Sequence, residues 1–166
     1  MKVLFKKNKS TKKIDAPVYI FFDIDGVLNK ETDWNKPFPI NKNNIEIFTE
    51  LITSLKDIYT YVRLVISSSW RAGYSKNNEN DTPQIEELKS VFQRKGYDIY
   101  AATPLSNKGR QREIEYYIKR NNVNHYVVID DEPSLYYDIS LLHFCKVDSK
   151  TGISLDDVKK ILKMHL

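Results

Sequence analysis

Two aspartates, Asp23 and Asp25, stand one residue apart at the end of the apolar run from Val18 to Phe22. The run is rich in β-branched and aromatic residues, which is typical of a strand buried on both faces of a parallel sheet. Side chains two residues apart leave a strand on the same side, and Gly26 lets the chain turn away. Carboxylates this close repel each other unless a cation or a proton separates them. We therefore predict a catalytic centre that binds a divalent, oxygen-seeking ion such as Mg2+.

The same Asp-x-Asp-Gly string has two other interpretations. A calcium-binding EF-hand loop requires a third acidic or amide residue before the glycine and a glutamate at its twelfth position. Counted from Asp23, that position is Trp34, so the calcium loop does not fit. A plain β-turn with two solvated aspartates stays open on this stretch alone. The rest of the chain has to decide.

Two further apolar runs also end in polar residues. The run 61–66 leads into Ser67-Ser-Ser-Trp-Arg71, and the run 125–129 leads into Asp130-Asp131. Functional sites of open α/β sheets form at the carboxyl ends of the strands. Three strands that end in Asp-x-Asp, Ser-Ser-Ser and Asp-Asp therefore indicate one shared site.

Helical and strand patterns alternate along the remainder of the chain. Helices are expected from a cap at Asn43 or Asn44 to Leu55, from Thr82 to Gly96, from Gly109 to about Arg120, and after a capping box at Ser154–Asp157; further strands are expected at 97–101 and 142–147. The alternation predicts an α/β fold whose parallel strands are joined by right-handed crossovers. Two polar loops, 29–44 and 72–82, are expected as a rim over the site and as a mobile segment.

Composition bounds the class of protein. The chain has 166 residues, 41% of them hydrophobic and 29% charged, which is typical of a soluble globular domain. No apolar run approaches a membrane span and no signal peptide is visible, so a cytoplasmic protein without membrane contact is expected. A basic tail over 1–15 and one domain over 16–166 are predicted, and the net charge of +4 is compatible with an anionic partner. The single cysteine, Cys145, excludes an internal disulfide and is expected to be a buried strand residue.

Four motifs now stand in order: Asp23-Ile-Asp-Gly-Val-Leu-Asn29, Ser67-Ser-Ser-Trp-Arg71, Lys108-Gly-Arg-Gln-Arg-Glu-Ile114 and Asp130-Asp131. Over residues 18–157 this pattern resembles the haloacid dehalogenase (HAD) superfamily of phosphohydrolases, and most closely the small HAD domains associated with RNA-repair proteins. The resemblance implies a Rossmann-like core, a parallel sheet flanked by helices. The segments between the motifs hold little more than one helix and one strand each, so a minimal cap or none is expected.

The resemblance also implies a mechanism. Asp23 would be the nucleophile that forms an aspartyl-phosphate. Asp25 would be the general acid that protonates the leaving oxygen and then the base that activates water. The family binds Mg2+ through the first aspartate side chain, the backbone carbonyl of the second and an acidic residue of the last motif. The implied metal set is therefore Asp23, Asp25, Asp131 and Asp130, with Asp131 bound directly and Asp130 either in the outer shell or bound through water.

Phosphate contacts are expected from the second and third motifs. Ser67 and Ser68 can offer hydroxyl and backbone N–H donors to phosphate oxygens, which repel a catalytic aspartate unless fixed donors offset the charge. In the third motif, one of Lys108, Arg110 and Arg112 is expected to face the site. Lys108 is favoured because it precedes a helix N-terminus, and Arg110 is the second choice.

Two residues beyond the serines are candidates for substrate binding. Arg71 could hold a substrate by charge and Trp70 by stacking on a base, although a packing role for Trp70 is the commoner one. The expected function is a Mg2+-dependent phosphomonoesterase whose open site admits a phosphorylated nucleic-acid end. Two alternatives stay open. A small-molecule or nucleotide phosphatase is favoured if the loop 29–44 folds over the site, and a non-catalytic phosphate-binding module is opposed by the intact Asp23 and Asp25.

Overall fold

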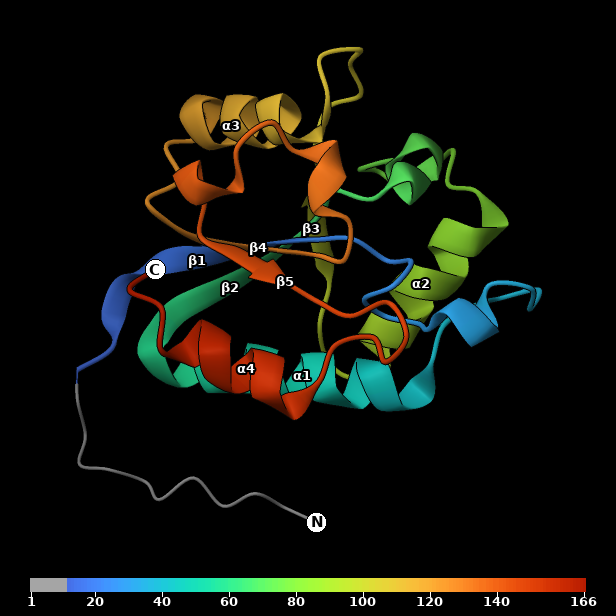
Figure 1. Cartoon of the computed structure of the whole chain (residues 1–166), viewed down its shortest axis with the longest axis horizontal. Helices are drawn as coiled ribbons and strands as arrows, with labels where there is room; N and C mark the ends of the chain where they lie inside the picture. The colour runs from blue at the N-terminus through green and yellow to red at the C-terminus, as the bar shows by residue number, and fades with distance from the viewer. Residues whose placement is uncertain (1–11) are drawn as a thin grey trace.

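Five parallel strands form one sheet in the order β3-β2-β1-β4-β5 (Figure 1). The computed structural model describes residues 12–166, so most of the predicted basic tail lies outside the described residues. The strands are β1 (Ile14–Phe22), β2 (Tyr59–Ile66), β3 (Ile99–Ala102), β4 (His125–Asp130) and β5 (Phe144–Lys146). The helices are α1 (Lys42–Ile58), α2 (Pro83–Gln93), α3 (Arg110–Arg120) and α4 (Leu155–Leu162). The predicted Rossmann-like α/β architecture is confirmed.

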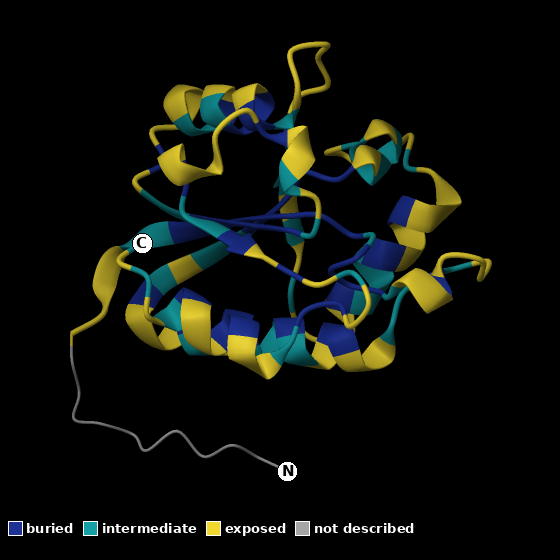
Figure 2. Ribbon diagram, viewed as in Figure 1, coloured by how far each residue is buried: buried dark blue, intermediate teal, exposed yellow. Residues whose placement is uncertain are grey.

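Helices cover both faces of the sheet. Along β1 the side chains of Val18, Ile20 and Phe22 pack into the core beneath α1, α2 and α4, because alternate residues of a strand point to the same face. Tyr19 and Phe21 point the other way, into a smaller core beneath α3. In Figure 2 the buried positions follow the strands and the sheet-facing sides of the helices. Residues Val18 to Phe22 of β1 are buried on both faces of the sheet, so this stretch is apolar and the next charged side chain comes where the strand ends.

The element boundaries differ from the predicted ones in two informative places. The cap of α1 is Asn41, not Asn43 or Asn44: its side-chain oxygen accepts hydrogen bonds from the backbone N–H groups of both those residues, at 3.0 and 3.4 Å. Three asparagines in a row of four give the same capping signal, and only the backbone path selects one. β3 is also displaced, beginning at Ile99 where Tyr97 was expected. The capping box of α4 is confirmed, since Ser154 and Asp157 bond each other's backbone N–H groups.

The single cysteine of the chain is buried in a strand. Cys145 lies in β5 and is 3% exposed, and burial raises the pKa of its thiol to about 12. The predicted buried strand position of Cys145 is confirmed. Across residues 12–166, none of the helices is both long enough and apolar enough to cross a membrane.

Lys89 anchors the polar loop over residues 72–82. Its ammonium group donates hydrogen bonds to the carbonyl oxygen of Ser75 at 2.8 Å and to the side chain of Asn78 at 2.7 Å. It also forms an ion pair with Asp81, whose side chain is 1% exposed. The loop that looked unstructured in the sequence is therefore held at one point by α2.

We expect Lys89→Met to lower the free energy of unfolding by about 3 kcal/mol, because it leaves the Asp81 carboxylate buried without its partner. Urea unfolding followed by circular dichroism measures the change. Lys95→Met is the matched control, since Lys95 pairs with Glu46 at the exposed surface and should cost less than about 1 kcal/mol. Equal losses in the two variants would contradict the anchoring role.

Candidate active site

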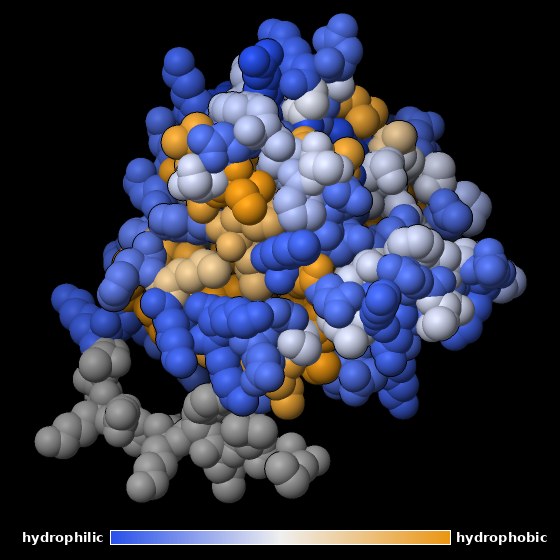
Figure 3. Space-filling model, in the orientation of Figure 1, coloured by the Kyte–Doolittle hydropathy of each residue, from blue (hydrophilic) through white to orange (hydrophobic). Residues whose placement is uncertain are grey.

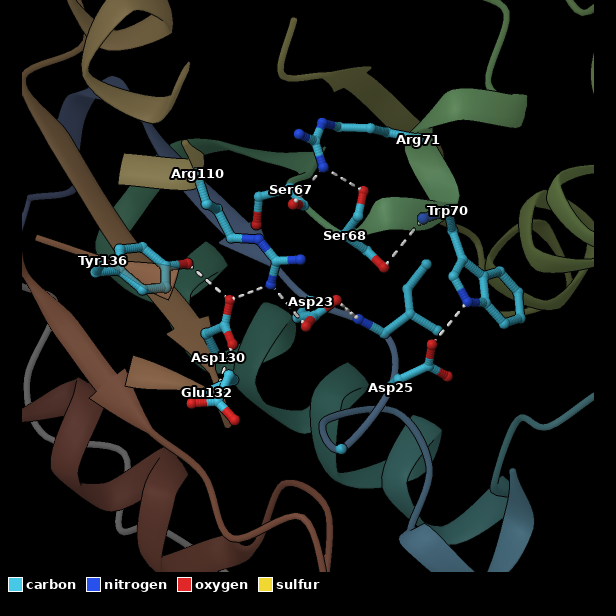
Figure 4. Close-up of polar contacts among 12 residues, drawn as sticks. Asp23, Asp25, Ser67, Ser68, Trp70, Arg71, Arg110, Asp130, Glu132 and Tyr136 are labelled. Atoms are coloured by element: carbon cyan, nitrogen blue, oxygen red, sulfur yellow. Dashed lines mark hydrogen bonds and ion pairs between the residues drawn. The ribbon is translucent and has the colours of Figure 1, made fainter. Parts of the chain in front are cut away.

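The carboxyl ends of the three strands that lead into the motifs, β2, β1 and β4, lie side by side (Figure 4). Asp23 follows β1, Asp130 is the last residue of β4, and Ser67 follows β2. Backbone hydrogen bonds fix their register: Asp23 N–H donates to the carbonyl of Ile129 and Ser67 N–H donates to the carbonyl of Phe22, each at 3.0 Å. The strand order reverses between β1 and β4, and this switch point is where open α/β sheets form their binding crevice.

Arg110 is the cation at the centre of the site. One guanidinium nitrogen donates to Asp23 Oδ2 at 2.8 Å and to Asp130 Oδ2 at 2.6 Å. Burial alone would lower the pKa of Arg110, but the two carboxylates outweigh it and raise that pKa above its usual value. Arg110 therefore stays charged and pairs with two of the clustered aspartates.

Asp23, Asp130 and Asp131 form the acidic cluster of the site. Each offers a carboxylate oxygen, and these oxygens all lie within 4.8 Å of one another. Burial and the charges of Asp23 and Asp130 raise the pKa of Asp131 to about 6. Burial and Asp23 likewise raise the pKa of Asp130, although Arg110 opposes them. The charge in this cluster exceeds what one arginine neutralises, and carboxylate oxygens at this spacing fit a hard divalent cation.

Gly26 is required at the turn for two reasons. Its φ of +76° lies in the left-handed region that favours glycine. A Cβ at this position would also lie 2.4 Å from the carboxylate of Asp131. The glycine therefore both turns the chain after Asp25 and leaves room for an acidic side chain of the cluster.

Asp25 points away from the acidic cluster. Its Oδ1 accepts a hydrogen bond from the Asn29 amide at 2.9 Å, and its Oδ2 accepts one from the Trp70 indole N–H at 3.0 Å (Figure 4). Asn29 and Trp70 engage the carboxylate of Asp25. The metal contact that the resemblance implies for Asp25 is therefore left to its backbone carbonyl. Trp70, expected to stack on a substrate or simply to pack, instead donates to this carboxylate.

Asn29 joins this region of the site and was not among the predicted site residues. It is fully buried, accepts hydrogen bonds from Gly26 N–H at 2.8 Å and from the Trp34 indole at 3.0 Å, and donates to the carbonyl of Pro39. Its place at the end of the first motif was the available signal. Asn29 fixes both the Asp25 side chain and the start of the loop after it.

The two serines after β2 have different surroundings. Both are fully buried. Among the described residues the Ser67 hydroxyl has no hydrogen-bond partner, whereas the Ser68 hydroxyl accepts from Trp70 N–H at 3.3 Å and caps the short helix η2 (Ser69–Gly73). A buried hydroxyl without a partner is costly unless a ligand or water completes it. Ser67 is thus the one of the two whose hydroxyl oxygen neither donates nor accepts a hydrogen bond among the described residues.

Arg71 braces the loop and does not offer a free charge to a substrate. Its guanidinium donates to the carbonyl oxygens of Ser67 at 3.0 Å and Ser68 at 2.7 Å, and it forms an ion pair with Glu113 of α3. The side chain is 8% exposed, and burial lowers its pKa. The predicted substrate contact through Arg71 is corrected accordingly. Glu113, which the sequence interpretation missed, also accepts the N–H of Ser106 at 2.7 Å and so ties three segments together.

The preference for Lys108 in the third motif is also corrected. Lys108 and Arg112 are exposed, and Arg110 alone of the three reaches the aspartates. The reason is that α3 begins at Arg110, so Lys108 lies in the loop before the helix. Arg112 points to another side of the helix than Arg110, because successive helical residues turn by about 100°. Tyr136 is a further unpredicted neighbour. Its hydroxyl donates to Asp130 Oδ2 at 2.7 Å, opposite Arg110.

The chain matches a known protein family. The family model described as "HAD domain in Swiss Army Knife RNA repair proteins" matches residues 19–158. No curated protein matches the chain. The matched segment spans every site residue described above, from the aspartates after β1 to those at the end of β4.

Proposed function

The chain belongs to the family of HAD domains in Swiss Army Knife RNA repair proteins, and from this premise we propose that residues 16–166 form a Mg2+-dependent phosphomonoesterase. The observation that carries the proposal is the surroundings of Asp23. Its carboxylate lies among Arg110, Asp130 and Asp131, at a strand edge where the buried Ser67 hydroxyl has no partner among the described residues. A nucleophile, a cation, candidate metal ligands and a hydroxyl donor thus meet in one place.

In the first step an Asp23 oxygen attacks the phosphorus of a phosphomonoester. The bond from phosphorus to the ester oxygen breaks, and Asp25 gives its proton to the departing oxygen. In the second step Asp25 takes a proton from water, whose oxygen attacks the phosphorus of the aspartyl-phosphate. Inorganic phosphate leaves and the Asp23 carboxylate is restored. Arg110 and the Ser67 hydroxyl are the donors that offset the charge on the transferred phosphoryl oxygens.

The acidic cluster is the part of the site that would hold Mg2+. Asp23 and Asp131 would bind it directly, Asp130 through water, and Asp25 through its backbone carbonyl. The three clustered carboxylates fit such an ion. Burial raises the pKa values of Asp130 and Asp131, the charge of Asp23 raises both further, and a bound cation would favour the charged forms. When bound, Mg2+ supplies positive charge that lets a phosphate dianion approach an aspartate.

Trp70 and Asn29 act as positioning residues for Asp25. Each donates to a different oxygen of that carboxylate, and the Trp70 indole is a donor only. The proton that Asp25 transfers must therefore sit on a lone pair that these two residues leave free. The two hydrogen bonds fix the direction in which that proton is delivered.

We expect Trp70→Phe to lower kcat/KM for a simple alkyl phosphate by roughly tenfold to 100-fold. The kcat/KM for 2,4-dinitrophenyl phosphate should stay within about twofold, because that leaving group departs without a proton. The ratio of the two kcat/KM values is the measurement, since kcat also contains the second step, in which Asp25 acts on water for both substrates. Trp34→Phe is the matched control, since its indole reaches Asp25 only through Asn29, and it should change the ratio less. Equal slowing of both substrates by Trp70→Phe would contradict proton delivery as the affected step.

A nucleic-acid end is the substrate that we favour. The connections from β1 to β2 and from β2 to β3 hold one main helix each, so no cap domain restricts the size of the substrate. The family name refers to RNA repair. The chain also carries a net charge of +4, which favours a polyanion.

A small-molecule phosphatase is the second candidate, and one contact favours it. The ring of Phe38 lies edge-on to Trp70, with centroids 6.3 Å apart, so the loop after Asn29 packs beside the residue that holds Asp25. Phe38 on that side narrows the opening through which a substrate would enter the site. Substrate preference decides between the two candidates.

Phosphate release in Mg2+ and in EDTA tests the proposed function. The substrates are p-nitrophenyl phosphate and oligonucleotides that carry a 3′- or a 5′-phosphate. We expect Mg2+-dependent release, with kcat/KM higher for one of the oligonucleotides. A higher value for small esters would favour the second candidate, and no release from any substrate would overturn the enzymatic proposal.

A further inference from the structure

A groove lies between the start of α3 and the segment that follows β4. We call it the α3 groove; it is lined by residues 108, 109, 111, 112 and 134–137 and has a volume of about 240 Å³. Two basic residues, Lys108 and Arg112, and two tyrosines, Tyr136 and Tyr137, line it, and no carboxylate does. Figure 3 shows apolar and hydrophilic side chains lying next to each other in this part of the surface, over α3 and the segment between β4 and β5.

The α3 groove borders the candidate active site. Tyr136 lines the groove and donates its hydroxyl to Asp130, so one side chain contacts both. Residues 109 and 111, which also line the groove, flank Arg110 in the chain. The Cα atom of Lys108 is two residues from that of Arg110, a span of at most about 7 Å. A chain whose terminal phosphate lies at Arg110 would reach the groove with its next units.

Tyr137 is the exposed aromatic residue of the α3 groove. The residue is 60% exposed, and its hydroxyl donates to the carboxylate of Glu115, 2.7 Å from one oxygen. Glu115 in turn accepts a hydrogen bond from the amide of Gln111 at 2.9 Å. The Arg112 guanidinium lies 5.6 Å from the centre of the tyrosine ring. The ring is therefore held in place by its hydroxyl while much of its surface stays open.

We propose that the α3 groove binds the single-stranded segment next to the terminal phosphate of a polynucleotide. One base would stack on Tyr137, and Lys108 and Arg112 would contact backbone phosphates. Exposed aromatic rings between basic side chains are the means by which proteins bind single strands without reading sequence. The inference rests on the proposed function, because it names the substrate class of the same site.

The charge of the neighbouring cavity supports this direction for the strand. A cavity of about 620 Å³ adjoins Asp131 on the other side of the site. Besides Asp131 it is lined by Asp148, Asp156 and Asp157, against two lysines. A phosphate backbone would meet net negative charge there, whereas the α3 groove presents cations without a lining acid.

Fluorescence anisotropy of labelled single-stranded oligonucleotides with a terminal phosphate tests the inference. All variants carry Asp23→Asn, so binding is measured without turnover, and RNA and DNA strands are compared. We expect Tyr137→Ala to raise Kd by about five- to 100-fold and Tyr137→Phe to change it by less than about twofold. Lys108→Met with Arg112→Met should reduce the slope of log K against log salt by about 1.4 in magnitude. Tyr116→Ala and Lys119→Met, exposed on α3 outside the groove, should leave Kd unchanged.

A strand with abasic sites beside its terminal phosphate distinguishes stacking from general attraction. Tyr137→Ala should leave the Kd of that strand within about twofold of the unsubstituted value. An equal loss for normal and abasic strands, or equal effects of the groove and control variants, would overturn the proposal. Absence of binding together with intact p-nitrophenyl phosphate hydrolysis would overturn the groove alone. Binding that depends on Tyr137 without any phosphate release would support the groove and overturn the phosphatase.

Discussion

Asp23→Asn should lower phosphate release from p-nitrophenyl phosphate by roughly 10⁴-fold or more, because the amide oxygen is a far weaker nucleophile than a carboxylate. The substitution nearly preserves volume, and the amide oxygen can still accept the hydrogen bond that the carboxylate receives from Ile24 N–H at 2.8 Å. The loss should therefore appear in kcat without loss of fold. Steady-state release in saturating Mg2+ is the measurement, together with mass spectrometry for a phosphorylated Asp23 peptide in quenched wild-type reactions.

Asp57→Asn is the matched control for this substitution. Asp57 is exposed near the end of α1, just before β2 begins, and so lies away from the carboxyl ends of the strands. Its variant should keep wild-type kcat. Circular dichroism of both variants checks the fold. Residual activity of Asp23→Asn above about a hundredth of the wild-type rate would exclude the aspartyl-phosphate route and point to direct attack by water.

Arg110→Met should reduce both activity and stability. Arg110 bonds Asp23 and Asp130 and is the cation in contact with the acidic cluster. Its removal takes away a donor to the transferred phosphoryl group, which should cost roughly 10²- to 10³-fold in kcat. Without metal it also leaves a buried carboxylate pair unbalanced, so the free energy of unfolding should fall by about 3–5 kcal/mol. Phosphate release and urea unfolding in EDTA are the two measurements.

Repeating the urea unfolding of Arg110→Met with Mg2+ tests whether the loss of stability arises at the acidic cluster. A cation that binds the folded cluster stabilises it by mass action, so Mg2+ should restore part of the stability that Arg110→Met loses in EDTA. Arg120→Met, at the exposed other end of α3, should change neither activity nor stability. Unaltered stability of Arg110→Met in EDTA would mean that the aspartates do not depend on this charge. A kcat near the wild-type value would reassign the phosphate contact to another residue.

Most of the sheet could be predicted from local patterns. The residues just before and including Phe22, Ile66 and Ile129 are apolar because the carboxyl-terminal parts of those strands are buried, and the structure ends β1 and β2 at those residues and β4 one residue later. Each run is a continuous stretch of sequence, so it can be recognised without knowing which segments it contacts in the folded protein. The polar residues after the runs therefore had to meet at one sheet edge once the strands were parallel. The α1 cap and the start of β3 were less certain because several neighbouring residues could serve equally well.

The contacts inside the site depended on packing between distant segments. Arg110 and Asp23 are 87 residues apart in sequence, Trp70 and Asp25 are 45 apart, and Arg71 and Glu113 are 42 apart. A motif shows that a basic residue is present but not where its helix begins, and the start of α3 decided that Arg110 turns inward while Lys108 stays exposed. Likewise, Arg71 was expected to contact a substrate, but its side chain is buried and forms an ion pair with Glu113. The local pattern that burial leaves was therefore enough to predict which strand ends meet. The direction and partner of each polar side chain could not be predicted in this way, because they depend on elements that are distant in sequence and come together only in the folded protein.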